Sequence, residues 1–335
     1  MAVSGTRLTV VQQVTRSAGF RGRPLAVTGR GLQGKSLRAA DVIPLPSLSV
    51  ARAYGLEIQT PSGLVLDNRD LVGKTAEQVD ALATQVDAIG NLSASRAPEI
   101  PIPETVRFDS TPYIFTMGAD DLGYSKPTRG ITITRPFGIG KYEVTVAEFR
   151  AFVDATNYEI TGQGAEQLTV RLADTSKDRH PVTFVHYDDT VAYTQWLSEK
   201  TGRRFRLPTE AEGEFVAAGT EGRKFPWGDE FDPSRLHSRS SGTTPVDQYQ
   251  SGATPDSVFD LAGNVWEWRK DFWADSYDPS KTQDPTGPEQ GTTRVLRGGS
   301  FYGEDADNFR SANRYDFDPS SRHDDYGFRV AEDLG

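Results

Sequence analysis

The chain has 335 residues, enough for two domains of ordinary size, and its 36% hydrophobic and 25% charged residues are typical of a folded globular protein. Its formal net charge of −10 provides no overall positive field to attract a phosphate backbone, so we do not expect nucleic acid as a partner. Cysteine is absent, which excludes thiol catalysis, disulfide bonds and thiolate metal sites.

The N-terminus carries no targeting signal that the sequence makes visible. Met1 is followed by Ala-Val-Ser-Gly-Thr-Arg, without the apolar segment of a signal peptide, so we expect synthesis in the cytoplasm. No run approaches the ~20 apolar residues of a membrane-spanning helix, so no membrane span is predicted. Cytoplasmic synthesis is compatible with a final place on a virion or at a cell surface.

Residues 1–74 alternate short β-like runs with glycine and proline. The runs are Arg7–Val14, Pro24–Thr28 and Gly55–Thr60. Turn residues between short runs of this composition are typical of strands joined by tight connections. The pattern predicts a small β-rich N-terminal domain that serves attachment.

A short helix and a linker are predicted over residues 75–104. Thr75 and Gln78 form a capping-box pattern, and apolar residues follow at spacings of three and four: Val79, Leu82, Val86 and Ile89. Two interpretations remain open, because two heptads are marginal alone: the helix packs on its own domain, or residues 72–90 form a short coiled coil that makes a homo-oligomer, with a trimer as the expected state. Residues 93–103 are rich in proline and predict an extended linker.

The domain predicted at 105–335 contains short strings in a specific order. They are Phe115–Gly118, Lys141–Phe149, His180–Val182, Tyr187–Leu197, Gly202–Glu212, Phe225–Gly228, Asp260–Trp268, Arg297–Ser300, Arg310–Arg314 and Gly327–Val330. The ordered set resembles the formylglycine-generating enzyme (sulfatase-modifying factor) family over about residues 105–333. This resemblance implies an α+β fold, the C-type lectin fold of the formylglycine-generating-enzyme type.

Several positions in these strings predict scaffold. Thr145 suits a helix N-cap, and Thr190–Lys200 has the apolar spacing of an amphipathic helix. Thr209 suits another N-cap, with Glu210 and Glu212 in the first turn, where carboxylates meet the positive end of the helix dipole. The family's usual tryptophan is replaced by Gly213, which implies either a local cavity or a gap refilled by another side chain.

The resemblance also suggests a metal site. Asn264 and Glu267 offer oxygen ligands, and in the resembled family this neighbourhood can bind calcium. The alternative is a hydrogen-bonded turn without metal. A structural calcium ion is therefore the one candidate cofactor, and no cofactor is predicted to be required. In the same string and near the C-terminus, Trp266 and Phe328 are predicted to lie in the core.

Catalysis of the family's kind is not expected. The resembled enzymes oxidise a substrate cysteine with paired cysteines that hold copper, and this chain has no cysteine. A second branch of the family uses a non-haem iron site with closely spaced histidines on a helix. The chain has four histidines, His180, His186, His237 and His323, and they do not supply that pattern. His180 and His186, six residues apart around an extended segment, are predicted to be structural.

The tail, residues 295–330, alternates fixed strings with two irregular segments, 301–307 and 315–326. Neither segment has a period of 2 or 3.6 residues, so neither is predicted to be a buried element. Aromatic residues among carboxylates are typical of a contact surface, although acidic loops with inward-facing aromatics remain an alternative. Four frame arginines are predicted to hold these loops through carboxylates or carbonyls: Arg297, Arg310, Arg314 and Arg329.

This arrangement resembles the variable proteins of diversity-generating retroelements, whose C-terminal C-type lectin domain carries codons mutated at adenines. Such codons give residues such as Phe, Tyr, Asp, Ser and His but not Glu or Lys. The resemblance implies these ligand-binding positions: Phe301, Tyr302, Tyr315, Asp316, Phe317, Asp318, Ser321, His323, Asp324 and Asp325. Glu304 does not obey the codon limit and is left out.

The sequence therefore predicts a non-catalytic protein that binds a protein or cell-surface ligand through a diversified tail, as a phage tail-fibre tip or bacterial surface adhesin would. Two other classes remain open. One is a cofactor-dependent modifying enzyme of the sulfatase-modifying factor family with an unrecognised site. The other is a purely structural virion component.

Overall fold

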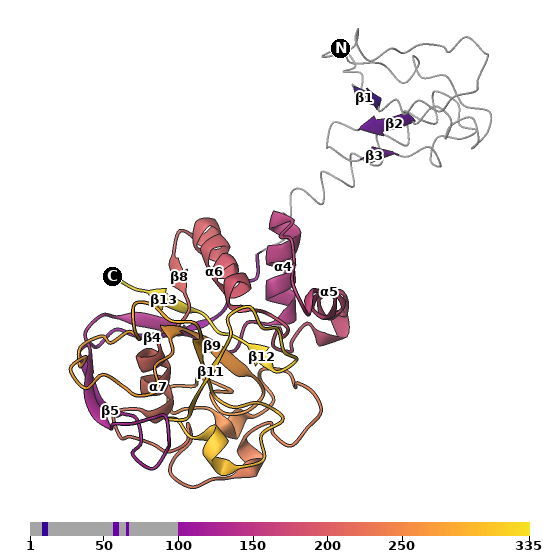
Figure 1. The fold of residues 1–335 in the computed structure, drawn as a ribbon. Coiled ribbons are helices and arrows are strands. Elements are labelled where there is room, and N and C mark those ends of the chain that lie inside the picture. Colours follow the sequence, from indigo (N-terminus) through magenta and orange to yellow (C-terminus); the bar gives the residue numbers. More distant parts are fainter. Residues whose placement is uncertain (1–8, 13–55, 60–64, 67–99) are drawn as a thin grey trace, which may run out of the picture. The chain divides into compact units, whose positions relative to one another are not determined.

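The computed structural model describes residues 9–12, 56–59, 65–66 and 100–335 (Figure 1). The chain divides into two compact units, residues 1–99 and 100–335. No helix within the described ranges is long and apolar enough to cross a membrane.

The first unit contains a small antiparallel sheet in the order β1-β2-β3. Its strands are β1 (Thr9–Gln12), β2 (Leu56–Gln59) and β3 (Val65–Leu66). Two of the predicted β-like runs contain β1 and β2. The predicted run at 24–28, the helix at 75–90 and the linker up to residue 99 lie outside the described residues.

The second unit has the predicted α+β architecture. Two four-stranded sheets have the orders β4-β7-β13-β8 and β11-β10-β9-β12, and β5 pairs with β6 in a hairpin. Its strands are β4 (Thr105–Phe108), β5 (Tyr113–Met117), β6 (Arg129–Ile133), β7 (Phe137–Gly140), β8 (Arg204–Arg206), β9 (Trp266–Phe272), β10 (Arg294–Arg297), β11 (Arg314–Phe317), β12 (Tyr326–Gly327) and β13 (Ala331–Asp333). The tail supplies β10, β11 and β12, so it is part of the second sheet.

Figure 1 shows α4, α5 and α6 grouped together, apart from α7. The helices are α4 (Val146–Thr156), α5 (Ala165–Ala173), α6 (Tyr187–Thr201) and α7 (Glu210–Ala218), with short 3-10 turns η2 (Thr175–Lys177), η3 (Pro233–Arg235), η4 (Gln250–Gly252) and η5 (Ala306–Phe309). One apolar cluster forms around α4 and α6, and a second forms between α7 and the β5-β6 hairpin. Phe328 lies in the first cluster and is fully buried, as predicted.

Side-chain caps set the helix starts. Thr145 accepts from the Glu148 backbone N–H, and the Glu148 carboxylate accepts from the Thr145 backbone N–H at 2.7 Å, so the predicted cap of α4 is confirmed. Thr209 caps α7 in the same way, as predicted. The predicted start of α6 at Thr190 is wrong: the helix begins three residues earlier, because His186 accepts from the Asp189 N–H through Nδ1.

The gap at Gly213 is refilled. A Cβ on this glycine would lie 2.8 Å from Nε of Arg269, whose side chain is fully buried beside α7. Arg269 also donates to Glu267 at 2.7 Å. A guanidinium on β9 therefore occupies the space that the family's tryptophan would take.

Candidate ligand-binding site

The base of the candidate site is a buried ion-pair network between the tail and α7. Arg314 donates to both oxygens of Glu210 at 2.7 and 2.9 Å, and Arg297 pairs with Glu214. Arg297 also donates to the carbonyls of Ser311 and Asn313, each at 3.0 Å. Burial alone would raise the pKa of Glu210, and the guanidinium groups of Arg314 and Arg297 hold that pKa below its usual value. Glu212, the other first-turn glutamate of α7, accepts from Arg206 at 2.7 Å, so both are scaffold, as predicted.

The other two frame arginines fix the tail to more distant segments. Arg329 binds Glu267 and donates to the carbonyls of Gly140 at 2.9 Å and Phe259 at 2.8 Å. Arg310 forms a two-pronged ion pair with Asp121, with both contacts at 2.9 Å. The predicted role of all four frame arginines is confirmed.

The predicted calcium ligands do not fit a cation. Both carboxylate oxygens of Glu267 accept from Arg329, and one also accepts from Arg269. Two buried guanidinium groups already neutralise this carboxylate and would repel a divalent ion. The Asn264 side chain accepts from the Thr244 N–H at 3.1 Å and donates to Glu143 at 2.9 Å. The arrangement is therefore the hydrogen-bonded turn that was the alternative to a metal site. The prediction that Asn264 and Glu267 coordinate calcium does not fit these contacts.

The predicted contact residues of the tail differ in exposure. Tyr302 and Tyr315 are 49% and 51% exposed. Asp318 and His323 are also exposed, and four further positions are half-buried: Asp316, Phe317, Ser321 and Asp324. Of these, Phe317 also packs against the core, with its ring 5.1 Å from that of Tyr326.

Two predicted contact residues are buried. Phe301 is 1% exposed and its N–H donates to the Asn264 carbonyl at 2.9 Å, so its placement on the contact surface was wrong. The ring lies inside the domain directly after the Arg297–Ser300 string and belongs to the frame. Asp325 is also buried, but it lines a surface cavity and is reached from there.

The cavity has a volume of about 380 Å³ and lies against one face of the second sheet. Four aromatic residues line it, together with His323 and Asp325: Tyr124, Trp266, Tyr315 and Tyr326. The rings of Trp266 and Tyr315 lie 5.9 Å apart at an interplanar angle of 37°. The tail therefore meets β9 and the segment after β5 at one aromatic pocket.

Trp266 was predicted to be a core residue, and the structure corrects this. It is half-buried at the cavity, whereas Trp268 is fully buried and donates to the Val185 carbonyl at 3.0 Å. Residues two apart on a strand share a face. One face of β9 therefore runs from the core at Trp268 to the surface at Trp266.

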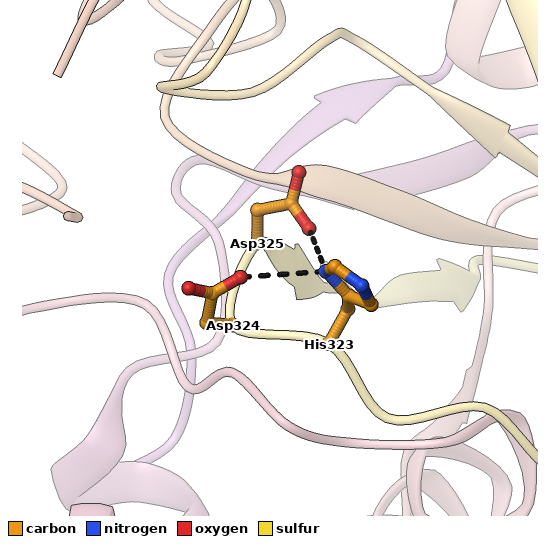
Figure 2. A group of neighbouring side chains, drawn as sticks. All are labelled: His323, Asp324 and Asp325. Carbon is orange, nitrogen blue, oxygen red and sulfur yellow. Dashed lines mark hydrogen bonds and ion pairs between the residues drawn. The ribbon is translucent and has the colours of Figure 1, made fainter. Parts of the chain in front are cut away.

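Figure 2 shows His323, Asp324 and Asp325 turned toward one another. Of the three, His323 and Asp325 line the cavity. Nδ1 of His323 lies 3.1 Å from Asp325 and 3.3 Å from Asp324. One ligand atom of each residue lies within 4.8 Å of the others, a spacing that could hold a divalent cation. Tyr302 donates to Asp324 at 2.7 Å, and this hydrogen bond raises the pKa of Tyr302 to about 12.

The other three histidines have structural partners. His180 Nδ1 lies 2.9 Å from the Thr243 hydroxyl, and His186 caps α6. His237 contacts the Gly242 carbonyl at 2.8 Å through Nε2. The predicted structural role of His180 and His186 is confirmed.

Sequence reasoning missed Tyr124, Trp266, Asn308 and Asn313, which also line the cavity. Tyr124 is 55% exposed, and its carbonyl accepts from Arg314 at 3.1 Å. No local pattern marks this tyrosine, because it lies about 190 residues before its partner in the chain. Trp266 was misplaced because its string alone does not distinguish a buried tryptophan from a surface one.

Residues 93–334 match the family described as "Sulfatase-modifying factor enzyme 1-like domain". The chain belongs to this family. The formylglycine-generating enzyme of Streptomyces coelicolor is 32% identical over 280 residues, which cover 65% of this chain and 86% of that one.

Two solved structures show the same fold. PvdO from Pseudomonas aeruginosa is 31% identical with a TM-score of 0.59, and the match covers 69% of this chain and 95% of that one. Variable protein 1 of Treponema denticola is 24% identical with a TM-score of 0.56, covering 68% and 94%. The sulfatase-modifying factor fold expected from the ordered strings is therefore confirmed.

Proposed function

We propose that this member of the sulfatase-modifying factor family is a non-catalytic protein that binds a protein or cell-surface ligand through its tail. The observation that supports this proposal most strongly is that the tail contains both exposed contact residues and buried frame arginines. Tyr302 and Tyr315 are half exposed, whereas Arg297 and Arg314 are 3% exposed. Tyrosine side chains provide a large contact area at a low entropy cost, as in antibody paratopes.

The proposed surface can change its side chains without losing its support. Arg297 donates to carbonyls of the fixed string 310–314, and Arg314 donates to a carbonyl just after β9. These acceptors are backbone groups outside the two irregular segments, so they do not depend on which side chains those segments carry. This separation favours a diversified surface over a single fixed site. In the proposal, the N-terminal unit attaches the protein to a virion or cell surface, and residues 72–90 make a trimer.

A randomised library tests the proposal. Codons for seven positions are randomised in a displayed full chain: Tyr302, Tyr315, Asp316, Asp318, Ser321, His323 and Asp324. We expect most variants to resist protease like the parent, and selection against unrelated proteins to yield binders. A matched library that randomises the four frame arginines should lose protease resistance. Equal loss in both libraries would refute a tolerant surface.

A second candidate is a cofactor-dependent modifying enzyme, and the His323, Asp324 and Asp325 group beside an aromatic cavity favours it. The proposed absence of formylglycine-generating activity is tested by incubating the chain with copper and a sulfatase-type cysteine peptide. Parallel reactions contain manganese, iron(II) or zinc. We expect no aldehyde above the blank in any of them, and turnover that His323→Ala abolishes would establish the enzyme instead.

A further inference from the structure

The walls of the cavity are aromatic. Trp266 and Tyr315 lie with their ring centroids 5.9 Å apart, and Tyr124 and Tyr326 add two more rings to the lining. The face of an aromatic ring carries partial negative charge and attracts a cation within about 6 Å. A cavity of about 380 Å³ with this lining is large enough for a planar cationic group.

One carboxylate, that of Asp325, lines the cavity, and a second, that of Asp324, lies beside it in the chain and also contacts His323. The side chain of Asp325 is 8% exposed, and burial raises the pKa of this carboxyl group. Its neighbour His323 lies between Asp325 and Asp324, at 3.1 and 3.3 Å. Even a protonated imidazole supplies one positive charge for these two carboxylates.

Arg314, the other cationic residue of the lining, does not balance this charge. Its guanidinium group pairs with both oxygens of Glu210 and donates to the carbonyls of Tyr124 at 3.1 Å and Ala274 at 2.7 Å. It also lies 4.0 Å from the ring of Trp273. Its charge and its donors are therefore committed to the frame.

We infer that this cavity accepts an arginine side chain presented by the partner, an inference that rests on the proposed ligand-binding function. A guanidinium group is planar, stacks on aromatic rings and can donate two parallel hydrogen bonds to one carboxylate. A lysine ammonium group is compact and more strongly hydrated, so it gains less from ring faces. The ligand surface that fits the tail is therefore basic, with arginine at the centre of the contact.

The test uses the full chain and three small probes. N-acetyl-arginine amide is titrated into the protein, and binding is followed by the NMR signal of the Trp266 indole N–H, identified with Trp266→Phe. N-acetyl-citrulline amide has nearly the same shape without the charge, and we expect it to bind at least about tenfold more weakly. N-acetyl-lysine amide should fall between the two.

Variants assign the binding to named groups. Asp325→Asn should weaken arginine binding by about tenfold, and Tyr315→Leu, at an exposed position with little effect on folding, by about threefold or more. Asp256→Asn removes the same charge from an exposed residue that does not line the cavity, and should change affinity less than about twofold. An equal effect of Asp256→Asn and Asp325→Asn would reduce the binding to general charge attraction and overturn the inference.

Three further results would overturn it. One is equal affinity for the arginine and citrulline probes. The second is that the arginine probe does not bind although the randomised library yields binders. That result would refute the arginine site and would still agree with the proposed ligand-binding function. The third is arginine binding that appears only with added manganese or zinc and is lost with EDTA, which assigns Asp325 to a metal ion. A randomised library that fails to fold would instead refute the proposed diversification. Its protease resistance is measured independently of probe binding.

Discussion

Phe301 and Tyr302 are neighbours in the chain with opposite environments: Phe301 is 1% exposed and Tyr302 is 49% exposed, although their ring centroids lie 4.3 Å apart. Phe301 therefore belongs to the frame and Tyr302 to the contact surface. The boundary between these two parts of the tail passes between adjacent residues.

This pair gives a sharp stability test. Phe301→Ala should reduce the free energy of unfolding by about 3–5 kcal/mol, because it empties a filled position in the core. Tyr302→Ala should cost about 0.5 kcal/mol or less, because the ring is solvent-exposed and its one hydrogen bond goes to half-exposed Asp324. Urea denaturation of both variants measures the difference. Similar losses would place Tyr302 in the core and remove it from the contact surface.

Arg269 and Gly213 should be energetically coupled. Gly213→Ala forces its new Cβ against Nε of Arg269 and should cost about 1–3 kcal/mol. In an Arg269→Ala background that clash is gone, so the same substitution should cost about 1 kcal/mol less than in the parent. A double-mutant cycle from denaturation curves measures this coupling. Additive losses would show that Arg269 does not fill the gap.

Glu267 should act as an anion between arginines rather than as a metal ligand. Glu267→Gln leaves Arg329 and Arg269 without their buried counter-charge and should cost about 3–5 kcal/mol. The melting temperature of the parent should be the same in calcium chloride and in EDTA. If calcium raises the melting temperature of the parent but not that of Glu267→Gln, Glu267 is a calcium ligand and this prediction is wrong.

His180 should make stability depend on pH. Burial, with Lys177 and Arg171 nearby, lowers the pKa of His180 to about 4 from its ordinary value of 6.5. The unfolded chain therefore binds this proton more readily, so the stabilisation is complete above about pH 6.5 and is lost as pH falls through about 4. The loss should reach about 3 kcal/mol at most. Denaturation of the parent and His180→Gln at pH 7 and pH 4.5 should show a steeper fall in the parent, and equal falls would contradict the assignment.

Local patterns predicted the scaffold well. Thr145 and Thr209 cap helices because capping depends on residues three positions apart, and the frame arginines find carboxylates or carbonyls because buried guanidinium groups require them. The site was harder to predict. Phe301 was predicted on the surface and is buried, because an irregular segment has no period that separates inward from outward residues. Trp266 was predicted in the core and lies at the cavity, because its string alone does not show which tryptophan of β9 is fully buried.

The cavity itself had no signal in the sequence. Tyr124 reaches it through a carbonyl contact with Arg314, and the His323, Asp324 and Asp325 group comes together in a loop rather than at helical spacing. The family's iron site has histidines close together on a helix, and that pattern does not describe one histidine beside two aspartates in a loop. Such sites depend on tertiary packing, which no single segment determines.

Deep sequencing of codons 295–330 in a growing population of the organism or virus that encodes the protein tests whether a diversified surface lies on a constant frame. We predict adenine-derived substitutions at the exposed positions, Tyr302 and Tyr315 among them, and none at Arg297, Arg314 or Arg329. We also predict a near-copy of this stretch beside a reverse transcriptase gene. Codons for Tyr302 and Tyr315 that vary no more than those of the frame arginines would contradict the diversified surface.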